Sequence, residues 1–430
     1  MADALSTLYA QRCDTHTVRG FDLVGPAGWV RVGAASARGW RLRQEDAHDA
    51  ALGSPTAPPS AEAFCAVLDG HAGAEVAQFC ARHLRATLHA TAAYQRDDVG
   101  GGLRDAFMQL DAALAAAHAP HDADADAVCA DGVGAPAHEA SASRGSASAQ
   151  WQGGSCLSVL AAALTLGATA LRRSGSAAQP LGAGAVLVLG ACAVATAIAA
   201  TATAAASLGA PPPRAALSAA ASPAVAPPLA REARSVQALE CGTAALAAVL
   251  RRGDDGSITV TVANAGTGRC VLSRFAAHGG PHVAVELSAE HRPAIATERR
   301  RILLADSPLS RVDARGRLDG VLACSRALGS LKYKQQPGLS ASEQVVSPVP
   351  DVRVASGVRS GDVLLLGTDG LWDCLTTKRA LSEARSERAR LGAGAPASAI
   401  CAALIDTCLG GSTRGGRGSD NVTVMIAEFE

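Results

Sequence analysis

Two short apolar runs in this chain each end in an Asp-Gly pair, and the two pairs lie three hundred residues apart. The first run spans 64–70 and ends in Asp69-Gly70, and the second spans 364–370 and ends in Asp369-Gly370. Runs of this length and composition indicate buried strands whose ends leave a carboxylate at a sheet edge. A third acid, Asp420, stands directly before another strand-like stretch. If these distant strand ends lie together, the number of folds that the chain can adopt is strongly limited.

Three such carboxylates would form a site made only of oxygen atoms, which suits Mg²⁺ or Mn²⁺ and not a soft metal. A single Asp-Gly pair is more typical of a plain turn, because Gly supplies a positive φ and Asp bonds its own backbone. The coincidence of three acidic strand ends with further acidic and basic motifs favours the metal site.

The bulk composition excludes several classes. The 430 residues can form one large domain or two ordinary ones. Lys plus Arg equals Asp plus Glu, at 39 each, so no nucleic acid or anionic membrane is expected as a partner. The 12 cysteines stand singly, with no Cys-x-x-Cys, which indicates buried thiols in a reducing compartment. The N-terminus lacks the regions of a signal peptide, and Ala2 excludes myristoylation. We expect a cytoplasmic or nuclear protein that is a monomer.

The apolar patterns predict helices near both ends of the chain and strands between them. An i, i+3, i+4 stripe runs from Val76 to Leu88, and a second helix is expected at 103–114. Strands are expected at 257–263, 269–273 and 282–287. Two further helices are predicted at 377–391 and 397–409, the latter with Ile400, Leu404 and Cys408 on one face. This order favours a layered α+β domain over alternating βαβ units.

A long insertion is predicted in the middle of the chain. Residues 115–238 are rich in Ala, Gly, Ser and Pro and cannot easily bury a core. We therefore expect an N-terminal extension at 1–28 and one domain at 29–430 that the insertion interrupts.

Part of the insertion carries no charge. Residues 182–210 are long enough to span a membrane, and 155–171 are at the lower limit. The longer stretch is dominated by Ala, so its hydrophobic drive is weak. A single span would also separate the acidic motifs across the bilayer. A soluble protein is the expectation, with a membrane hairpin within 155–210 as the alternative.

Taken in order, the motifs resemble those of one enzyme family, the metal-dependent Ser/Thr protein phosphatases of type 2C (PPM). The resemblance covers residues 30–112 and 240–430. It rests on these motifs: Arg41 with Glu45-Asp46, Asp69-Gly70-His71, Gly266-Thr267-Gly268-Arg269, His291-Arg292-Pro293, Ser325-Arg326, Asp369-Gly370 and Asp420-Asn421.

The resemblance implies a fold and an activity. The fold is a four-layer α-β-β-α sandwich, in which two antiparallel sheets are flanked by helices. The activity is hydrolysis of phosphoserine and phosphothreonine in phosphoprotein substrates. It uses two Mg²⁺ or Mn²⁺ ions and a water between them, with no phospho-enzyme.

The same resemblance assigns the metal ligands. Asp69 corresponds to the carboxylate that bridges two cations, and the Gly70 carbonyl supplies a further oxygen. Asp369 and Asp420 complete the ligand set, and Glu45 and Asp46 hold metal-bound waters.

Two further residues receive catalytic roles from the resemblance. Arg41 binds the substrate phosphate with a forked guanidinium, and its spacing before Glu45 selects it over Arg43. His71 protonates the leaving Ser or Thr oxygen as general acid. Without the resemblance, Arg41 would be interpreted as a surface arginine and His71 as a turn histidine.

The chain departs from the family pattern at two positions. Thr267 replaces an Asp that is associated, together with the acid matching Asp373, with a third and weaker metal. Ser330 stands where Asp is common. The third site is therefore expected to be weakened, while the two-metal core keeps its ligands.

Two functions remain open at this point. The leading one is the metal-dependent phosphatase, and the alternative is a catalytically silent pseudophosphatase that binds partners through the same fold. A thiol phosphatase is set aside. The spacing Cys, five residues, Arg occurs at Cys13 and Cys408 without the usual preceding His.

Overall fold

The computed structural model describes residues 19–55, 57, 61–118, 227–275, 282–409 and 418–430, which belong to one unit of the chain. The expected membrane hairpin and most of the expected insertion lie outside this described part.

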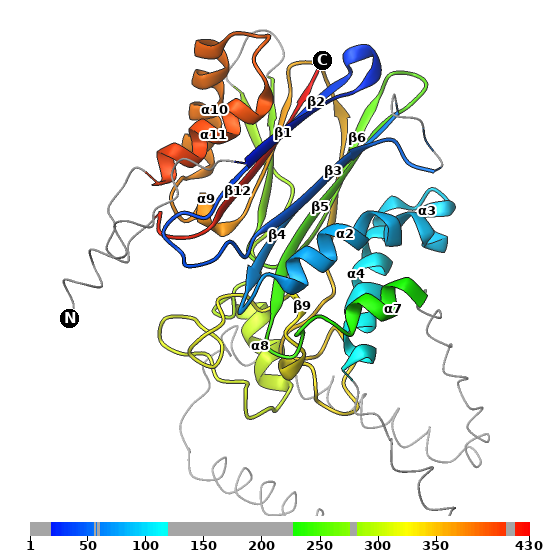
Figure 1. Cartoon of the computed structure of the whole chain (residues 1–430), viewed down its shortest axis with the longest axis vertical. Coiled ribbons are helices and arrows are strands. Elements are labelled where there is room, and N and C mark those ends of the chain that lie inside the picture. Colours follow the sequence, from blue (N-terminus) through cyan, green and yellow to red (C-terminus); the bar gives the residue numbers. More distant parts are fainter. Residues whose placement is uncertain (1–18, 56, 58–60, 119–226, 276–281, 410–417) are drawn as a thin grey trace, which may run out of the picture. The chain divides into compact units, whose positions relative to one another are not determined.

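Two antiparallel sheets form the centre of the unit (Figure 1). The first sheet contains, in spatial order, β1 (Arg19–Val24), β2 (Val30–Ala37), β12 (Val422–Phe429), β11 (Val363–Gly367), β7 (Arg269–Arg274) and β8 (Val283–Glu286). The second contains β10 (Asp351–Val358), β6 (Ile258–Ala265), β5 (Gly242–Arg252), β4 (Glu62–His71) and β3 (Ala47–Leu52), and the short β9 (Leu328–Gly329) pairs with β5.

Side-chain alternation explains why the sheets stack. Along β4, Phe64 and Leu68 belong to the core between the second sheet and its helices, whereas Cys65 and Val67 belong to the core between the sheets. Successive side chains of a strand point to opposite faces, so a strand that is apolar throughout must be covered on both sides.

Helices cover the outer face of each sheet. On the second sheet lie α2 (Glu75–Ala90) and α4 (Val99–Ala117), with α3 (Ala92–Gln95) and α7 (Pro227–Ala233) packed against them. On the first sheet lie α9 (Asp369–Trp372), α10 (Thr377–Leu391) and α11 (Ala397–Leu409). Separately, α8 (Ala296–Leu304) and the segment 305–346 share a smaller core. The predicted α+β four-layer sandwich is confirmed.

Several predicted elements are confirmed, and their boundaries follow local signals. The helices predicted at 377–391 and 397–409 are α10 and α11. The start of α10 is fixed by Thr376, whose side chain accepts a hydrogen bond from the Arg379 amide, as an N-cap does. The helix predicted at 103–114 is longer, because α4 begins after an N-cap at Asp98.

Some residues expected in the N-terminal extension and in the insertion belong to the folded unit. Residues 19–24 form β1 and pair with β2, so they are part of the first sheet. Helix α7 lies inside the stretch expected as insertion, and Val236 and Ala238 beyond it are buried in the core below α2 and α4. Composition misled here, because small apolar residues can fill narrow spaces between helices as well as form loops.

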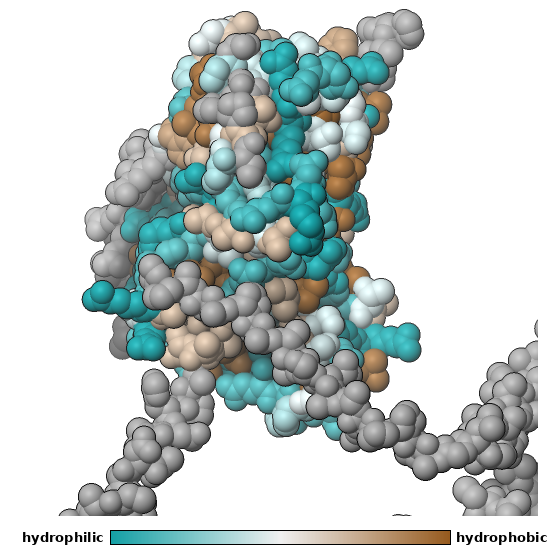
Figure 2. Space-filling model, turned by 90° about the vertical axis from the view of Figure 1, so that its right-hand side faces the viewer, coloured by the Kyte–Doolittle hydropathy of each residue, from teal (hydrophilic) through white to brown (hydrophobic). Residues whose placement is uncertain are grey.

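The surface hydropathy and the helix lengths of the described residues can be compared with what a membrane span requires. On the face shown in Figure 2, hydrophilic residues are spread over the surface and apolar residues lie among them. In this part of the chain, no helix is long and apolar enough to cross a bilayer.

Candidate functional site

Four acidic side chains meet at one end of the two sheets. Asp46 directly precedes β3, and Asp69 lies near the end of β4, beside it in the ladder that pairs Ala47 with Leu68. Asp369 follows β11, and Asp420 precedes β12. The strands thus bring together acids that are far apart in the sequence, as the Asp-Gly pattern predicts.

Asp46 joins the two sheets at this end. Its Oδ2 accepts hydrogen bonds from the hydroxyls of Thr423 (2.7 Å) and Thr368 (3.2 Å), which belong to the first sheet and its following turn. Burial raises the pKa of Asp46 to about 8, and the charges of Asp420 and Asp369 act in the same direction, against the two hydroxyl donors. The side chain is 8% exposed. Asp46 is thus a buried link between the sheets.

Asp69 and Asp369 lie at the centre of the cluster. Burial raises the pKa of Asp69 well above its usual range, and the charges of Asp369, Asp46 and Asp420 add to the effect. Burial also raises the pKa of Asp369 to about 6, with Asp420 and Asp373 contributing. Among the described residues, Asp69 Oδ2 is buried without any hydrogen-bond partner. Such an unpaired buried oxygen is costly unless a ligand compensates it.

The cluster has the donor chemistry of a hard-cation site. Mutually repelling carboxylates from separate segments are stabilised by a divalent cation, and Mg²⁺ and Mn²⁺ prefer oxygen ligands. In the described part of the chain, no three His, Cys, Asp or Glu side chains are placed so that they could hold a metal ion as they stand. The residues therefore fit such an ion by chemistry, while the ligand geometry is not assembled.

Arg41 lies against this cluster. Its Nη2 donates to Asp420 Oδ2 at 2.6 Å, and its side chain is 56% exposed. Burial raises the pKa of the neighbouring Glu45, an effect that the Arg41 charge opposes and the Asp420 charge supports. The arginine is accessible from solvent and neutralises the Asp420 carboxylate at the edge of the cluster.

Two glycines allow the acidic segments to approach each other. A Cβ on Gly70 would lie 2.2 Å from the Glu45 carbonyl oxygen, and a Cβ on Gly370 would lie 2.0 Å from the Asn421 carbonyl oxygen. Neither glycine has a positive φ. Glycine is therefore required here for close backbone approach, and the turn interpretation based on positive φ is wrong.

Asn421 positions the segment that carries Arg41 and Glu45. Its Oδ1 accepts from the Glu45 amide at 2.9 Å, and its Nδ2 donates to the carbonyls of Arg38 (2.7 Å) and Arg43 (3.0 Å). One buried amide thus holds both ends of the 38–45 turn against β12. The sequence placed Asn421 beside Asp420 but gave it no role, because its three partners are more than 370 positions away in the chain.

His71 does not hydrogen-bond to the carboxylates. Its Nε2 is 2.7 Å from Ser330 Oγ, so the ring connects β4 to the turn after β9. Burial lowers the pKa of His71 to about 4, and the charges of Lys334 and Lys332 contribute. At neutral pH the ring is therefore uncharged in this arrangement.

The residues expected at a third metal site have other partners. The Thr267 hydroxyl donates to Asp369 Oδ2 at 3.3 Å. Asp373 lies at the edge of the cluster, where its Oδ1 accepts from Arg292 Nη2 at 3.0 Å. Arg292 was part of the motif series without a role. Its guanidinium supplies positive charge on the side of the cluster where Thr267 lacks a carboxylate.

Comparison with known proteins gives consistent matches. The family model described as protein phosphatase 2C matches residues 30–135 and 200–414. "Probable protein phosphatase 2C 60" of Arabidopsis thaliana is 27% identical over 401 residues, covering 93% of this chain and 87% of that protein. "Probable protein phosphatase 1N" of Mus musculus is 28% identical over 428 residues, covering 99% of this chain and 70% of that protein.

Solved structures match in fold. A crystal structure of a phosphatase from Toxoplasma gondii aligns with a TM-score of 0.56 at 19% identity, covering 96% of this chain and 95% of that one. A serine-threonine phosphatase 2C from the same organism aligns with a TM-score of 0.52 at 15% identity, covering 96% and 100%. At these identities the likeness concerns the fold alone.

Proposed function

This chain belongs to the protein phosphatase 2C family, and from that membership we propose that it hydrolyses phosphoserine and phosphothreonine in phosphoproteins with two Mg²⁺ or Mn²⁺ ions. The observation that carries the proposal is the group of carboxylates at Asp46, Asp69, Asp369 and Asp420. Burial and neighbouring carboxylates raise the pKa values of Asp46, Asp69 and Asp369 around an unpaired Asp69 oxygen.

The acidic residues would hold the cations. Asp69, the Gly70 carbonyl, Asp369 and Asp420 are the proposed ligands, and Glu45 and Asp46 are proposed to act through water. Bound divalent cations supply positive charge for the phosphoryl oxygens and activate water at neutral pH. Of Glu45 and Asp46, Asp46 is the more rigidly placed, because the hydroxyls of two threonines donate hydrogen bonds to its Oδ2.

Arg41 is proposed to bind the substrate phosphate. Its guanidinium is exposed and lies at the edge of the carboxylates, where a phosphate would arrive. If Arg41 moved from Asp420 to the phosphate, the Asp420 carboxylate would become free to bind a metal ion. Phosphate binding and metal binding would therefore favour each other. A guanidinium suits this role because its forked donors match two phosphate oxygens.

His71 is proposed as the proton donor to the leaving Ser or Thr oxygen. Because Nε2 is hydrogen-bonded to Ser330 and burial keeps the ring uncharged, donation requires the ring to give up that bond and to take up a proton first. The proposed third metal site is weak, since Thr267 offers a neutral hydroxyl and Asp373 is paired with Arg292.

The alternative proposal is a pseudophosphatase, and two observations favour it. Arg41 and Asp420 form an ion pair, and the ligand geometry is not assembled in the described residues. A silent protein would have no chemical need for the full set of acids, which favours the enzyme.

Replacement of Asp69 by Asn tests the proposal. Asp69→Asn should abolish nearly all Mn²⁺-dependent hydrolysis of an aryl phosphate and weaken Mn²⁺ binding measured by calorimetry, with unchanged circular dichroism. Asp254→Asn, at an exposed turn between β5 and β6, is the matched control and should retain both properties. Wild-type protein that binds Mn²⁺ without turnover would support the pseudophosphatase. Equal Mn²⁺ binding by the wild type and Asp69→Asn would refute the metal centre.

A further inference from the structure

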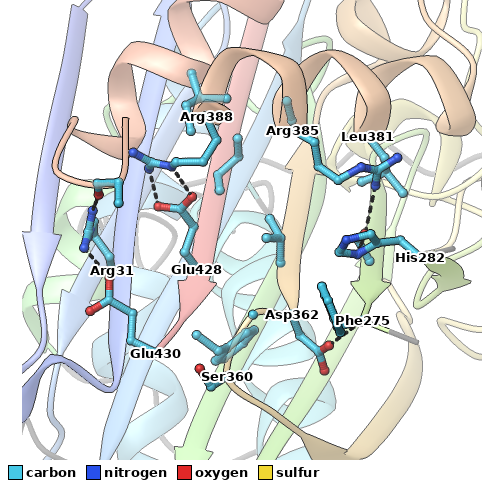
Figure 3. A pocket seen from close by; sticks show the side chains of 18 of the residues that line it. Arg31, Phe275, His282, Ser360, Asp362, Leu381, Arg385, Arg388, Glu428 and Glu430 are labelled. Carbon is cyan, nitrogen blue, oxygen red and sulfur yellow. Dashed lines mark hydrogen bonds and ion pairs between the residues drawn. The ribbon is translucent and has the colours of Figure 1, made fainter. Parts of the chain in front are cut away.

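A cavity lies between α10 and the outer face of the first sheet, away from the acidic cluster. Its volume is about 520 Å³, within the range of pockets that bind small molecules. Apolar side chains form much of its wall, among them Phe275, Val363, Leu381, Ile400 and Phe429. Figure 3 shows basic side chains around the cavity, with Arg385 and His282 on one side and Arg31 and Arg388 on the other.

The sequence of α10 explains why the space is open. Leu381, Ala384 and Arg388 are spaced three to four residues apart, so they follow one another on the helix face toward the sheet. Only Leu381 in this row is a large apolar residue. The cavity opens to solvent, and the small or polar residues of this row leave it unfilled.

Two of the three arginines at the cavity are already neutralised. Arg388 donates to both oxygens of Glu428 and to the carbonyls of Gly392 and Ala395. Arg31 pairs with Glu430 and donates to the carbonyl of Ala393. These two pairs close one side of the cavity and leave no net charge there.

Arg385 differs from its neighbours. Among the described residues, its guanidinium makes a single hydrogen bond, from Nη1 to Ser273 Oγ at 3.2 Å, and has no acidic partner. Ser273 Oγ is also 3.5 Å from His282 Nδ1. The remaining acid of the lining, Asp362, accepts from the backbone amides of Phe275 (2.7 Å) and Arg359 (3.0 Å). Among the lining residues that the structure describes, Arg385 is thus the arginine without a carboxylate partner, and most of its donors have no acceptor there.

We propose that this cavity binds a compact, mainly apolar molecule that carries one carboxylate group. The apolar walls would take the body of the molecule, and Arg385 would take the carboxylate through charge-assisted hydrogen bonds, with Ser273 beside it. Arg385 is partly buried and has no acidic partner among the described residues, which makes an anionic ligand preferable to a neutral or cationic one of the same shape.

The proposed site is separate from the acidic cluster. It contacts Val363, at the start of β11, and Phe429, at the end of β12. Asp369 and Asp420 lie at the opposite ends of these two antiparallel strands. Binding at the cavity therefore does not require a working phosphatase site, and the inference stands independently of the proposed function.

Calorimetry with a naphthalene carboxylate tests the proposal on the full-length chain. Naphthoate should bind at one site per chain, and naphthyl methanol and naphthylmethylammonium, with the same rings, should bind at least about tenfold more weakly. Arg385→Gln should weaken naphthoate binding by about tenfold or more, because it removes the charged partner. Arg379→Gln is the matched control, since Arg379 lies on the same helix and its side chain is 60% exposed. It should leave binding unchanged.

Filling the space gives a second test. Ala384→Leu should abolish naphthoate binding with unchanged circular dichroism. If that variant does not fold, Ala389→Trp at the exposed rim takes its place and should block entry. The proposal is overturned if naphthoate does not bind, if the neutral or cationic analogue binds as tightly, if Arg385→Gln binds like Arg379→Gln, or if the filled variant still binds.

Discussion

Substitution of Gly70 by alanine should damage the site through a single backbone contact. The added Cβ would lie 2.2 Å from the Glu45 carbonyl oxygen and 3.2 Å from the Gly73 carbonyl oxygen. Both neighbours are backbone atoms, so no side-chain rotation can relieve the contact. The segment that carries Glu45 and Asp46 must therefore move away from Asp69.

The size of the effect follows from that distance. The Glu45 carbonyl has to move by roughly 1 Å before the contact is an ordinary van der Waals one. Overpacking of this kind costs about 1–3 kcal/mol of folding free energy. For a folded unit of this size, that lowers the melting temperature by roughly 2–10 °C. A displacement of about 1 Å between positioned groups lowers turnover by about a hundredfold. Activity should thus fall much more than stability.

Two measurements on one pair of variants check this expectation. Melting followed by circular dichroism gives the loss of stability, and Mn²⁺-dependent hydrolysis of an aryl phosphate gives kcat. Gly394→Ala is the control, because its added Cβ meets nothing within 4 Å and its φ is not in the left-handed region. It should match the wild type in both measurements.

The reasoning is refuted if Gly70→Ala and Gly394→Ala have the same kcat and melting temperature. Equal losses of kcat and of folded fraction would also contradict it. That outcome would mean that the glycine serves the fold in general, and not the approach of the Glu45-Asp46 segment to Asp69.

The other predictions concern single side chains of the site. Arg41→Ala should raise KM strongly and change kcat little, and Arg43→Ala should do neither; a dominant effect on kcat would exclude phosphate binding. His71→Gln should lower kcat more for alkyl than for aryl phosphates, and equal losses would exclude a general acid. Without metal, Thr267→Asp should lower the melting temperature, because it adds a buried like charge beside Asp369. Mn²⁺ should restore the melting temperature, and turnover of the variant should saturate at a lower Mn²⁺ concentration than that of the wild type. Superimposable metal titrations would mean that this position is immaterial.

Local signals predicted the helices on the first sheet well. The stripe of α11 and the N-cap of α10 are contained within a few neighbouring residues, so composition and spacing suffice to find them. The strands β1 and β3 were not singled out, because Arg19–Val24 and Ala47–Leu52 are short runs that mix apolar residues with charged and polar ones. Such strands are recognised by the strands with which they pair, and the sequence pattern of one segment does not contain that information.

The acids of the site could be predicted, whereas the residues that hold them could not. Asp69 and Asp369 are marked by their strand ends. The roles of Asn421, Thr423 and Thr368 depend on hydrogen bonds to the Arg38–Asp46 segment, and any Asn or Thr at a strand end offers the same pattern. The ion pair of Arg41 with Asp420 also has no local signal, since it joins residues 379 positions apart.

The place of β12 has a consequence for the biosynthesis of this enzyme. It lies between β2 and β11, although it follows every other described strand in the sequence. While the ribosome is still translating, the second sheet can pair with itself, but β2 waits for a neighbour that is encoded some 385 codons later. At about 5–20 residues per second, that wait lasts roughly 20–80 seconds. Asp420 and Asn421 arrive with the same strand, so a nascent chain has no complete acidic cluster. We therefore expect a nascent chain to be inactive until β12 has been made and has paired with β2 and β11.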